Sequence, residues 1–301
     1  MKIKTAFFFS IPLICVIFAS NKRGNMKVRN LLLLFGVMLL IAACGSDKAS
    51  TTSNPTAPRL KGDLTVYGLA CDGCSDSVVV LLPEDDSDPV TYNIIEADKH
   101  GRILGKLQVG DRIAVVPNKK NAHKADLVVD IDRLMGIWCY IVMPTLREAQ
   151  NLSKAEQLRM IKSMPDSLKE TYLIPREYGF YLKPEWEAQS VGYVQEANSL
   201  AEESPVVYPP LGFFTGWRMW NGKLIIMSGT PHFGDGGKLK VTNQVTDTCD
   251  IDYLDADSLV LSSDGVSRSY YRKNDINDVN ARAKAIEQMR SKQALEQTKA
   301  E

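Results

Sequence analysis

Leu134-Met135-Gly136-Ile137-Trp138 begins the stretch that decides the fold of nearly half of this 301-residue chain. Further on, residues 217–229 read as a strand, an Asn-Gly turn and a second strand, which is a strong short-range signal for a β-hairpin. Residues 247–254 then lead into a third apolar run at residues 257–261, and the region closes with Arg-Ser-Tyr-Tyr-Arg at residues 268–272. The pattern predicts a region built mainly of β-strands.

The order of these segments resembles the lipocalins and their bacterial lipocalin-like relatives. Gly136-x-Trp138 at the head of the first strand looks like the opening signature of that family. The Trp-bearing hairpin is followed by D-T-x-x-I at residues 247–251, D-S-L-V-L at 257–261 and Y-x-R at 270–272. That order is similar to lipocalin-like domains in lipoproteins of Bacteroidetes. The resemblance covers about residues 134–273 and implies a lipocalin-like antiparallel β-barrel.

Trp138 and Arg272 are expected to have a structural role in such a barrel. A tryptophan of the first strand closes the narrow end of a small barrel, and an arginine of the last strand stacks on its face. Arg272 is the expected partner and Arg268 the second choice, while Gly136 belongs to the same signature. A cation–π contact contributes about 0.5–2 kcal/mol, so this pair is expected to stabilise the fold and not to bind a ligand.

Four aromatic residues of the same region are candidates for lining a ligand cavity. An eight-stranded barrel is either filled by its own side chains or holds one small ligand, and both alternatives stay open. Alternation along a strand sends some side chains inward and others outward, but sequence does not set the register. The candidate lining residues are Phe180, Trp217, Trp220 and Tyr270.

Residues 144–175 depart from a simple barrel pattern. Ser153 and Glu156 have the Ser-x-x-Glu spacing of a capping box, and apolar residues follow at helical spacing. We expect a helical insertion there, with a second short helix near residues 167–172. The insertion either covers the mouth of the barrel or packs outside it. After the barrel, residues 274–301 are predicted to be a solvent-exposed helical or frayed tail.

Residues 60–133 predict a second, smaller β-domain. Residues 64–67 and 78–82 are β-branched, apolar runs bounded by turn residues, and further runs of the same kind follow. Five or six strands in about 70 residues suit a compact barrel, for which the oligonucleotide/oligosaccharide-binding (OB) type is a candidate. That fold by itself implies no ligand.

Cys71-Asp72-Gly73-Cys74 in the smaller domain has three interpretations. Asp-Gly is typical of a two-residue hairpin turn, which would place Cys71 and Cys74 opposite each other at a spacing that a disulfide can bridge. A structural disulfide is the leading prediction for an exported chain. Unpaired thiols come second, and redox or metal chemistry comes third because no βαβ context and no second cysteine pair accompany the motif. Cys139 and Cys249 either pair across the larger barrel or stay unpaired.

Leu39-Leu40-Ile41-Ala42-Ala43-Cys44 indicates export. Lys27 and Arg29 precede an apolar run at residues 31–41, and small residues stand directly before the cysteine, which is the pattern of a cleaved signal. The pattern resembles a bacterial lipoprotein signal, and in that family the cysteine becomes the first mature residue and carries the acyl chains. Residues 1–43 are therefore predicted to be a signal segment and Cys44 the lipidation site.

The chain before Met26 has two explanations. Translation starts at Met26, or the first residues form a helix that lies in the inner membrane before processing. Residues 44–59 contain no large apolar side chain, so they predict a flexible, lipid-anchored tether. The expected location is the cell envelope, with the chain anchored to the outer membrane on its periplasmic or its surface side.

Charge excludes one class of partner. Without residues 1–43, which hold six basic and no acidic residues, the chain keeps 30 basic and 36 acidic side chains, a formal charge of −6. Nucleic acid is therefore not an expected partner, because its binding depends on neutralising phosphates.

Sequence offers no catalytic motif. The three histidines, His100, His123 and His232, lie far apart, and no nucleophile elbow, zinc-protease motif or phosphate loop is found. We expect no enzyme, no cofactor and no metal. The leading hypothesis is a non-catalytic envelope lipoprotein whose barrel binds a small apolar ligand or serves as an interaction module. The alternative is a structural or assembly partner of envelope proteins, with a filled barrel and no ligand.

Overall fold

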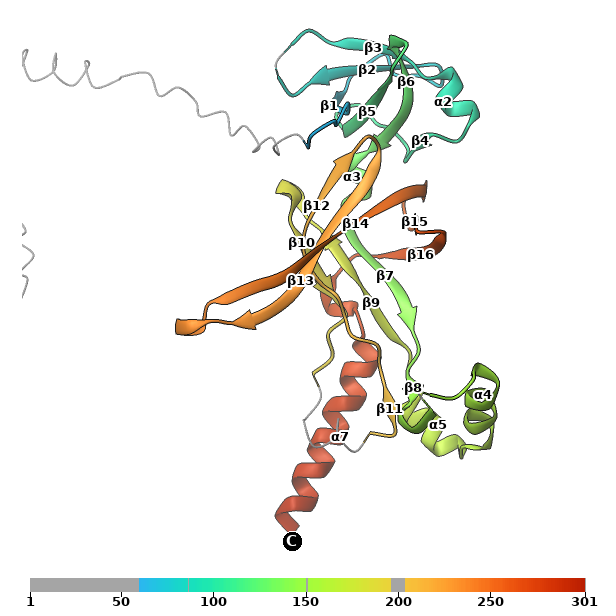
Figure 1. Cartoon of the computed structure of the whole chain (residues 1–301), viewed down its shortest axis with the longest axis vertical. Helices are drawn as coiled ribbons and strands as arrows, with labels where there is room; N and C mark the ends of the chain where they lie inside the picture. The colour runs from blue at the N-terminus through green and yellow to red at the C-terminus, as the bar shows by residue number, and fades with distance from the viewer. Residues whose placement is uncertain (1–59, 86, 150, 196–203, 301) are drawn as a thin grey trace, which may run out of the picture. The chain divides into compact units, whose positions relative to one another are not determined.

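The computed structural model describes residues 60–85, 87–149, 151–195 and 204–300, which form two β-barrels and a C-terminal helix (Figure 1). These residues fall within one compact unit that runs from Asn54 to Glu301. The predicted signal segment, the tether and Cys44 lie outside the described residues. The part of the chain that the structure describes holds no helix with the length and apolarity needed to span a bilayer. The predicted all-β class, with a small barrel before a larger one, is confirmed.

Five strands of the smaller barrel close into a ring. Its elements are β1 (Val66–Ala70), β2 (Val78–Pro83), β3 (Val90–Asn93), α2 (Ile95–Lys99), β4 (Ile103–Leu104), β5 (Arg112–Asn118) and β6 (Asn121–Asp130). β1 pairs antiparallel with β2 and β5, β2 pairs with β3, and β5 pairs with β6. A parallel pairing of Asn93 with Lys124 joins β3 to β6 and completes the ring. This order is that of an OB-type barrel.

Strands β5 and β6 are buried on both faces, and this joins the two barrels. Val115 of β5 and Val128 of β6 point into the core of the smaller barrel. Their neighbours Ala114 and Val129, on the alternate face, are equally buried but belong to the core of the larger barrel. Because side chains alternate between the two faces of each strand, the pair β5 and β6 contributes to both cores. Burying such side chains contributes roughly 1.5–3 kcal/mol for each valine.

The connection from β1 to β2 differs from the predicted two-residue hairpin. Ala70 lies opposite Leu81, and the Cys71 amide donates to the Val80 carbonyl, so Val80 and not Cys74 faces Cys71. Cys74 follows in the connection, where its sulfur accepts a hydrogen bond from the Val80 amide. Both cysteines are free thiols in this part of the structure. The predicted hairpin register is therefore wrong, and the disulfide that depended on it is not formed here.

Eight antiparallel strands form the larger, nearly closed barrel. Helix α3 (Ile131–Leu134) leads into it, and its strands are β7 (Gly136–Val142), β9 (Arg176–Leu182), β10 (Ala188–Val191), β12 (Phe213–Trp220), β13 (Lys223–Phe233), β14 (Leu239–Leu254), β15 (Ser258–Ser263) and β16 (Val266–Lys273). The strand order β10-β9-β7-β16-β15-β14-β13-β12 places the first strand beside the last. At the seam between β10 and β12, the Ser190 hydroxyl accepts from the Phe214 amide and donates to the Gly212 carbonyl. The Ser190 side chain thus links β10 to β12, where the two strands share little backbone pairing.

The insertion between β7 and β9 is helical, as predicted. It contains β8 (Thr145–Leu146), a short 3-10 turn (Arg147–Ala149), α4 (Lys154–Ser163) and α5 (Asp166–Tyr172). The capping box is present, because the Ser153 hydroxyl accepts from the Glu156 amide and the Glu156 carboxylate accepts from the Ser153 amide. β8 pairs with β11 (Val206–Val207), and Leu146 and Val206 form a small core with side chains of α4 and α5. The insertion therefore has a core of its own.

The C-terminal helix α7 (Ala281–Ala300) is fastened to the barrel, which corrects the prediction of a fully exposed tail. Asn280 precedes it and is 4% exposed. Its side-chain oxygen accepts from the Glu177 amide at 2.6 Å, and its side-chain nitrogen donates to the carbonyls of Glu177 and Gly192 at 2.9 and 2.7 Å. Ala283 is buried below this contact. From Gln288 to Glu296, the described side chains are exposed or half-buried.

The turn between β12 and β13 ties the larger barrel to the smaller one. Asn221 and Gly222 have φ angles of +48° and +79°, the left-handed conformation that makes Asn-Gly favourable in a two-residue turn. The Asn221 side-chain oxygen accepts from the Leu64 amide, and the Asn221 amide donates to the Asp63 carboxylate. A Cβ at residue 222 would lie 2.0 Å from Leu127 of the smaller barrel, so glycine also meets a packing requirement.

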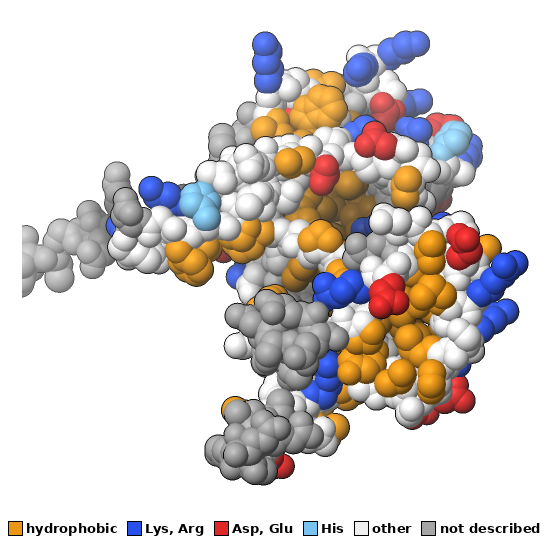
Figure 2. Space-filling model, turned by 60° about the horizontal axis from the view of Figure 1, so that its bottom comes forward, with side chains coloured by type: hydrophobic (Ala, Val, Ile, Leu, Met, Phe, Trp, Pro, Cys, Tyr) orange, Lys and Arg blue, Asp and Glu red, His pale blue; other side chains and the backbone are white. Residues whose placement is uncertain are grey.

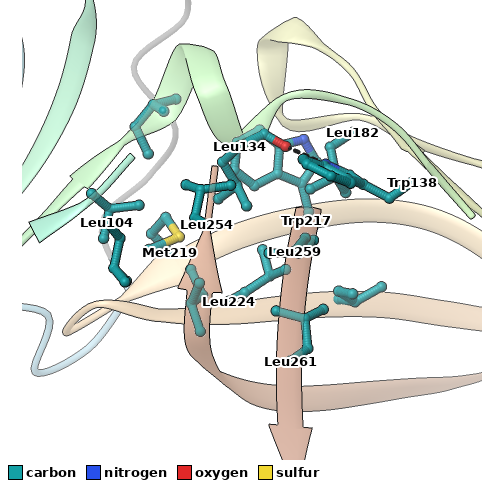
Figure 3. Packing of buried hydrophobic residues seen from close by; sticks show 14 of the residues in the cluster. Leu104, Leu134, Trp138, Leu182, Trp217, Met219, Leu224, Leu254, Leu259 and Leu261 are labelled. Carbon is teal, nitrogen blue, oxygen red and sulfur yellow. Dashed lines mark hydrogen bonds between the residues drawn. The ribbon is translucent and has the colours of Figure 1, made fainter. Parts of the chain in front are cut away.

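Trp138 closes the end of the larger barrel next to α3. Its side chain is fully buried, and its indole nitrogen donates to the Leu134 carbonyl at 2.8 Å (Figure 3). Arg272 lies opposite it in register, with the guanidinium carbon 4.2 Å from the centroid of the Trp138 ring. The same guanidinium donates to the carbonyls of Met135 and Arg133. One arginine therefore binds the last strand to the first strand and to the segment that joins the barrels.

We predict that Arg272→Ala lowers the free energy of unfolding by about 2–4 kcal/mol. The change removes a desolvated cation–π contact and leaves backbone carbonyls without their donor. Arg268→Ala is the matched control, because Arg268 also stacks on an aromatic ring, that of Tyr140 at 4.3 Å, but is exposed. It should cost less than about 1 kcal/mol. Denaturant unfolding of both variants checks this, and equal losses would contradict the role given to Arg272.

Candidate functional site

The four aromatic residues predicted to line a cavity do not share one space. Phe180 and Trp217 are 2% and 1% exposed and belong to the packed core of the larger barrel. Tyr270 is half-buried against Phe180, with ring centroids 5.2 Å apart. Trp220 lies three residues after Trp217, hence on the opposite face of β12, and its indole nitrogen donates to the Lys61 carbonyl. The prediction for Trp220 is therefore wrong, and the other three residues pack in or against the core.

A cleft of about 420 Å³ lies at the other end of the barrel, which we call the mouth cleft. β9 begins there, because Arg176 pairs with Val142 at the end of β7, four positions beyond the pair of Trp138 and Phe180. Figure 2 is turned to bring this end forward and shows hydrophobic side chains among basic and acidic ones. The lining includes two arginines, three tyrosines and several apolar residues, among them Arg147, Arg176, Tyr178, Tyr193, Tyr208, Val194, Val206, Pro209 and Pro210.

Arg176 is held rigidly in the wall of the mouth cleft. The side chain is only 7% exposed, and its guanidinium carbon lies 3.5 Å from the centroid of the Tyr208 ring. Tyr208 is fixed in turn, because its hydroxyl donates to the Ile174 carbonyl at 2.6 Å. Stacking on an aromatic face orients a guanidinium. The cleft therefore has one pre-oriented cation.

Arg147 adds a second cation at the rim. The residue directly follows β8, and its backbone amide donates to the Pro205 carbonyl at 2.8 Å. Its side-chain Nε donates to the Ser204 carbonyl at 3.0 Å. The pairing of Leu146 with Val206 sets this geometry, because it aligns β8 with β11. The insertion therefore supplies a functional side chain to the cleft.

Glu177 lies next to Arg176 in sequence but does not add free negative charge to the cleft. Lys273 lies 2.7 Å from its carboxylate, and Tyr271 donates to the same oxygen at 2.6 Å. Burial acts to raise the pKa of Glu177, but hydrogen bonds from Lys273, Tyr271 and Asn280 outweigh it and hold the pKa below the ordinary value. The negative charge is thus matched by Lys273 of β16, which lies beyond β7 in the sheet.

The floor of the mouth cleft depends on the clamp at Asn280. Gly192 lines the cleft, and its carbonyl accepts a hydrogen bond from the Asn280 side chain. Gly192 has a φ of +111°, and a Cβ there would lie 2.2 Å from the Glu177 carbonyl oxygen. The chain approaches β9 closely enough at this point that only glycine fits. The start of the C-terminal helix therefore supports the cleft from below.

A neighbouring cleft of about 360 Å³ shares the segment of residues 207–210 with the mouth cleft. Gln157 of α4, Met143 and Thr145 line its other side. The insertion is expected either to cover the mouth of the barrel or to pack outside it, and each expectation is partly met. α4 packs on its own small core outside the barrel, and it still borders a cleft at the mouth.

The lining of the mouth cleft combines cationic, aromatic and apolar groups. Its described lining carries two guanidinium groups and no acidic residue. Tyr193 is 72% exposed and offers an open aromatic surface beside them. Arginine forks bind carboxylate and similar oxyanions through paired hydrogen bonds, while aromatic and proline walls pack against apolar groups.

Within the described residues, no three His, Cys, Asp or Glu side chains come close enough to hold a metal ion. Cys139 and Cys249, which do not line the mouth cleft, are free. Burial raises the pKa of the Cys139 thiol to about 12, so it is protonated at neutral pH.

A third cleft, of about 410 Å³, lies at the closed end beside Arg272 and is bordered by several aspartates. Asp130 is the most buried of them, at 1% exposure, and its carboxylate accepts from the Arg133 amide as the N-cap of α3. Burial raises the pKa of Asp130 to about 6, and the nearby carboxylates of Asp111 and Asp132 add to the rise. This carboxyl group therefore caps α3, the helix that joins the two barrels.

The structure brings together Gly136, Trp138 and Arg272 at the closed end, as the family resemblance implies. A Cβ on Gly136, whose φ is +128°, would lie 2.1 Å from an Arg272 nitrogen, so the glycine makes room for the arginine. Sequence reasoning missed Arg147, Arg176 and Tyr208. They come from three separate segments, and no local motif marks them.

No family model and no curated protein matches this chain. A solved structure described as a lipocalin-like protein from Bacteroides thetaiotaomicron is similar to it, with 20% sequence identity and a TM-score of 0.24. The similarity covers 47% of this chain and 97% of that one.

We predict that Asp130→Asn changes how stability depends on pH. The pKa of Asp130 is about 6 in the folded chain and near 4 when unfolded, so its contribution is full below about pH 4 and is lost as pH rises through 6. Asparagine caps helices as well as aspartate does and does not titrate. The variant should therefore gain about 1–3 kcal/mol relative to the original chain between pH 4 and pH 7. Urea unfolding at several pH values measures the difference, and a constant difference would contradict the raised pKa.

Proposed function

We propose that this protein is a non-catalytic lipoprotein of the cell envelope that binds a small, largely apolar molecule with an acidic group at the mouth of its barrel. The observation that carries the proposal is the mouth cleft, where Arg176 is buried and stacked on Tyr208 with its guanidinium at the cleft wall.

The size of the cleft supports a small molecule. A volume of about 420 Å³ falls within the roughly 300–1,000 Å³ that is usual for ligand pockets. The packing of Phe180 and Trp217 in the core supports a site at the mouth and not deep inside the barrel. The resemblance of residues 134–273 to lipocalin-like domains supports a binding role for the barrel as a whole.

The envelope location is the second part of the proposal. The apolar run at residues 31–41, followed by Ala42-Ala43-Cys44, supports cleavage and lipidation at Cys44. The acyl chains would then hold the protein to the outer membrane, on its periplasmic or its surface side. The two barrels would stand away from the bilayer on the tether of residues 44–59.

The alternative is a structural or assembly partner of other envelope proteins. The filled core at the closed end favours it, because a barrel without a cavity has only its surface to offer. A chain that copurifies with another envelope protein, and that binds no acidic ligand, would support this alternative.

The test is the affinity for a probe with the proposed chemistry. Anilinonaphthalene sulfonate carries an aromatic body and a sulfonate, and its fluorescence rises on binding to apolar surfaces. We predict that Arg176→Gln lowers its affinity about tenfold or more, because the bond from a buried cation is lost. Arg147→Gln should lower it about two- to fivefold, because this arginine is exposed.

Two controls accompany the titration. Arg159→Gln removes an exposed arginine of α4 that borders neither the mouth cleft nor its neighbour, and it should leave the affinity unchanged. Tyr193→Ala removes the open aromatic surface without touching a buried residue, so it reports on the cleft even if Arg176→Gln does not fold. The proposal is rejected if Arg176→Gln, Arg147→Gln and Tyr193→Ala all bind the probe with the affinity of the original chain, as the control Arg159→Gln should.

A further inference from the structure

Strands β13 and β14 continue beyond the barrel as a two-stranded arm. Both strands are bulged near Gly229, and from Thr230 to Phe233 β13 pairs only with the segment of residues 239–242 in β14. The side chains of Thr230 and Phe233 are exposed, and so is almost every residue of β14 as far as Thr248. Figure 1 shows the arm projecting from the sheet. Neither face of the arm packs on a core.

The arm is nevertheless amphipathic. Phe233 lies directly opposite Leu239, and Pro231 lies opposite Val241, so these four side chains share one face. Phe233 is 79% exposed and Leu239 is 51% exposed. A period-two apolar pattern normally marks a strand with one buried face, yet this face is covered by nothing else in the described chain.

Two lysines accompany the apolar face. Lys240 lies opposite His232 on the other face of the arm, and Lys238 is next to Leu239. Figure 2 shows hydrophobic and lysine side chains together on this arm, at the left of the view. With Asp235 in the turn, residues 230–242 carry two lysines against one aspartate, a formal charge of +1, whereas residues 44–301 carry −6.

We propose that the tip of this arm inserts into the headgroup region of a bilayer that contains anionic lipids. Phe233 and Leu239 would enter the apolar boundary, and Lys238 and Lys240 would contact the phosphates, as in other surface-binding amphipathic elements. A protein partner fits less well, because a face of four residues is far smaller than the roughly 800 Å² that each side of a stable protein interface buries.

The inference does not depend on the mouth cleft or on lipidation at Cys44. In a chain that is also lipidated at Cys44, the arm would act as a second contact that fixes the orientation of the barrel above the membrane. Since single weak membrane contacts are readily reversible, a second one strengthens retention at the surface.

The experiment measures binding of the compact unit of residues 54–301, which contains every described core but not Cys44. The probes are vesicles of phosphatidylcholine with phosphatidylglycerol and vesicles of phosphatidylcholine alone, compared by cosedimentation. We expect binding to the anionic vesicles that weakens as salt is added. F233S/L239S and K238Q/K240Q should each weaken it roughly tenfold.

Val266→Ser is the matched control, because Val266 is another exposed apolar residue, at 66%, on a different hairpin. It should bind vesicles as the original unit does. Circular dichroism confirms that the variants fold. Absence of binding to anionic vesicles, or undiminished binding by F233S/L239S, would overturn the proposal. A second result would also overturn it. If the unit formed a concentration-dependent dimer but did not bind vesicles, and F233S/L239S abolished the dimer, the arm would be assigned to contact with a second copy of the chain.

Discussion

Arg272 holds the last strand of the larger barrel against the first, with its guanidinium 4.2 Å from the centroid of the buried Trp138 ring. The same group donates to the carbonyls of Arg133 and Met135, which lie between the two barrels. Gly136 must be glycine for the guanidinium to fit. Closure of the barrel and attachment of its neighbour therefore depend on one cation, whose desolvation is offset by an aromatic face and by oriented carbonyls.

This closed end decides where binding is possible. Trp138 and Trp217 fill the interior together with leucines from several strands, and β5 and β6 cover the end from outside (Figure 3). A cleft remains at the opposite end, where Arg147 and the stacked Arg176 both belong to the lining. The clamp at Asn280 then supports this end through Gly192. The fold separates a stabilising end from an end that presents a ligand-sized cleft.

Local signals account for the features that sequence predicts well. The Asn-Gly turn at residues 221–222 and the capping box of Ser153 and Glu156 each depend on neighbours within a few residues. The features it misses depend on distant segments. Cys71 faces Val80 because pairing along β1 sets the register, and the Asp-Gly pair does not override it. Arg147 and Arg176 come to line the same cleft only after the barrel and its insertion have folded, so no spacing in the sequence marks the cleft.

On the proposed function, a ligand binds at the mouth while the barrel interior stays packed. Correlation spectra of amide and indole N–H groups test this directly, because Trp138 and Trp217 report on the interior and Gly192 and Tyr193 report on the mouth. Titration with anilinonaphthalene sulfonate should shift the amide signals of Gly192 and Tyr193 and leave the indole signals of Trp138 and Trp217 in place. Shifts of those two indoles without shifts at the mouth would place the ligand inside the barrel and contradict this account.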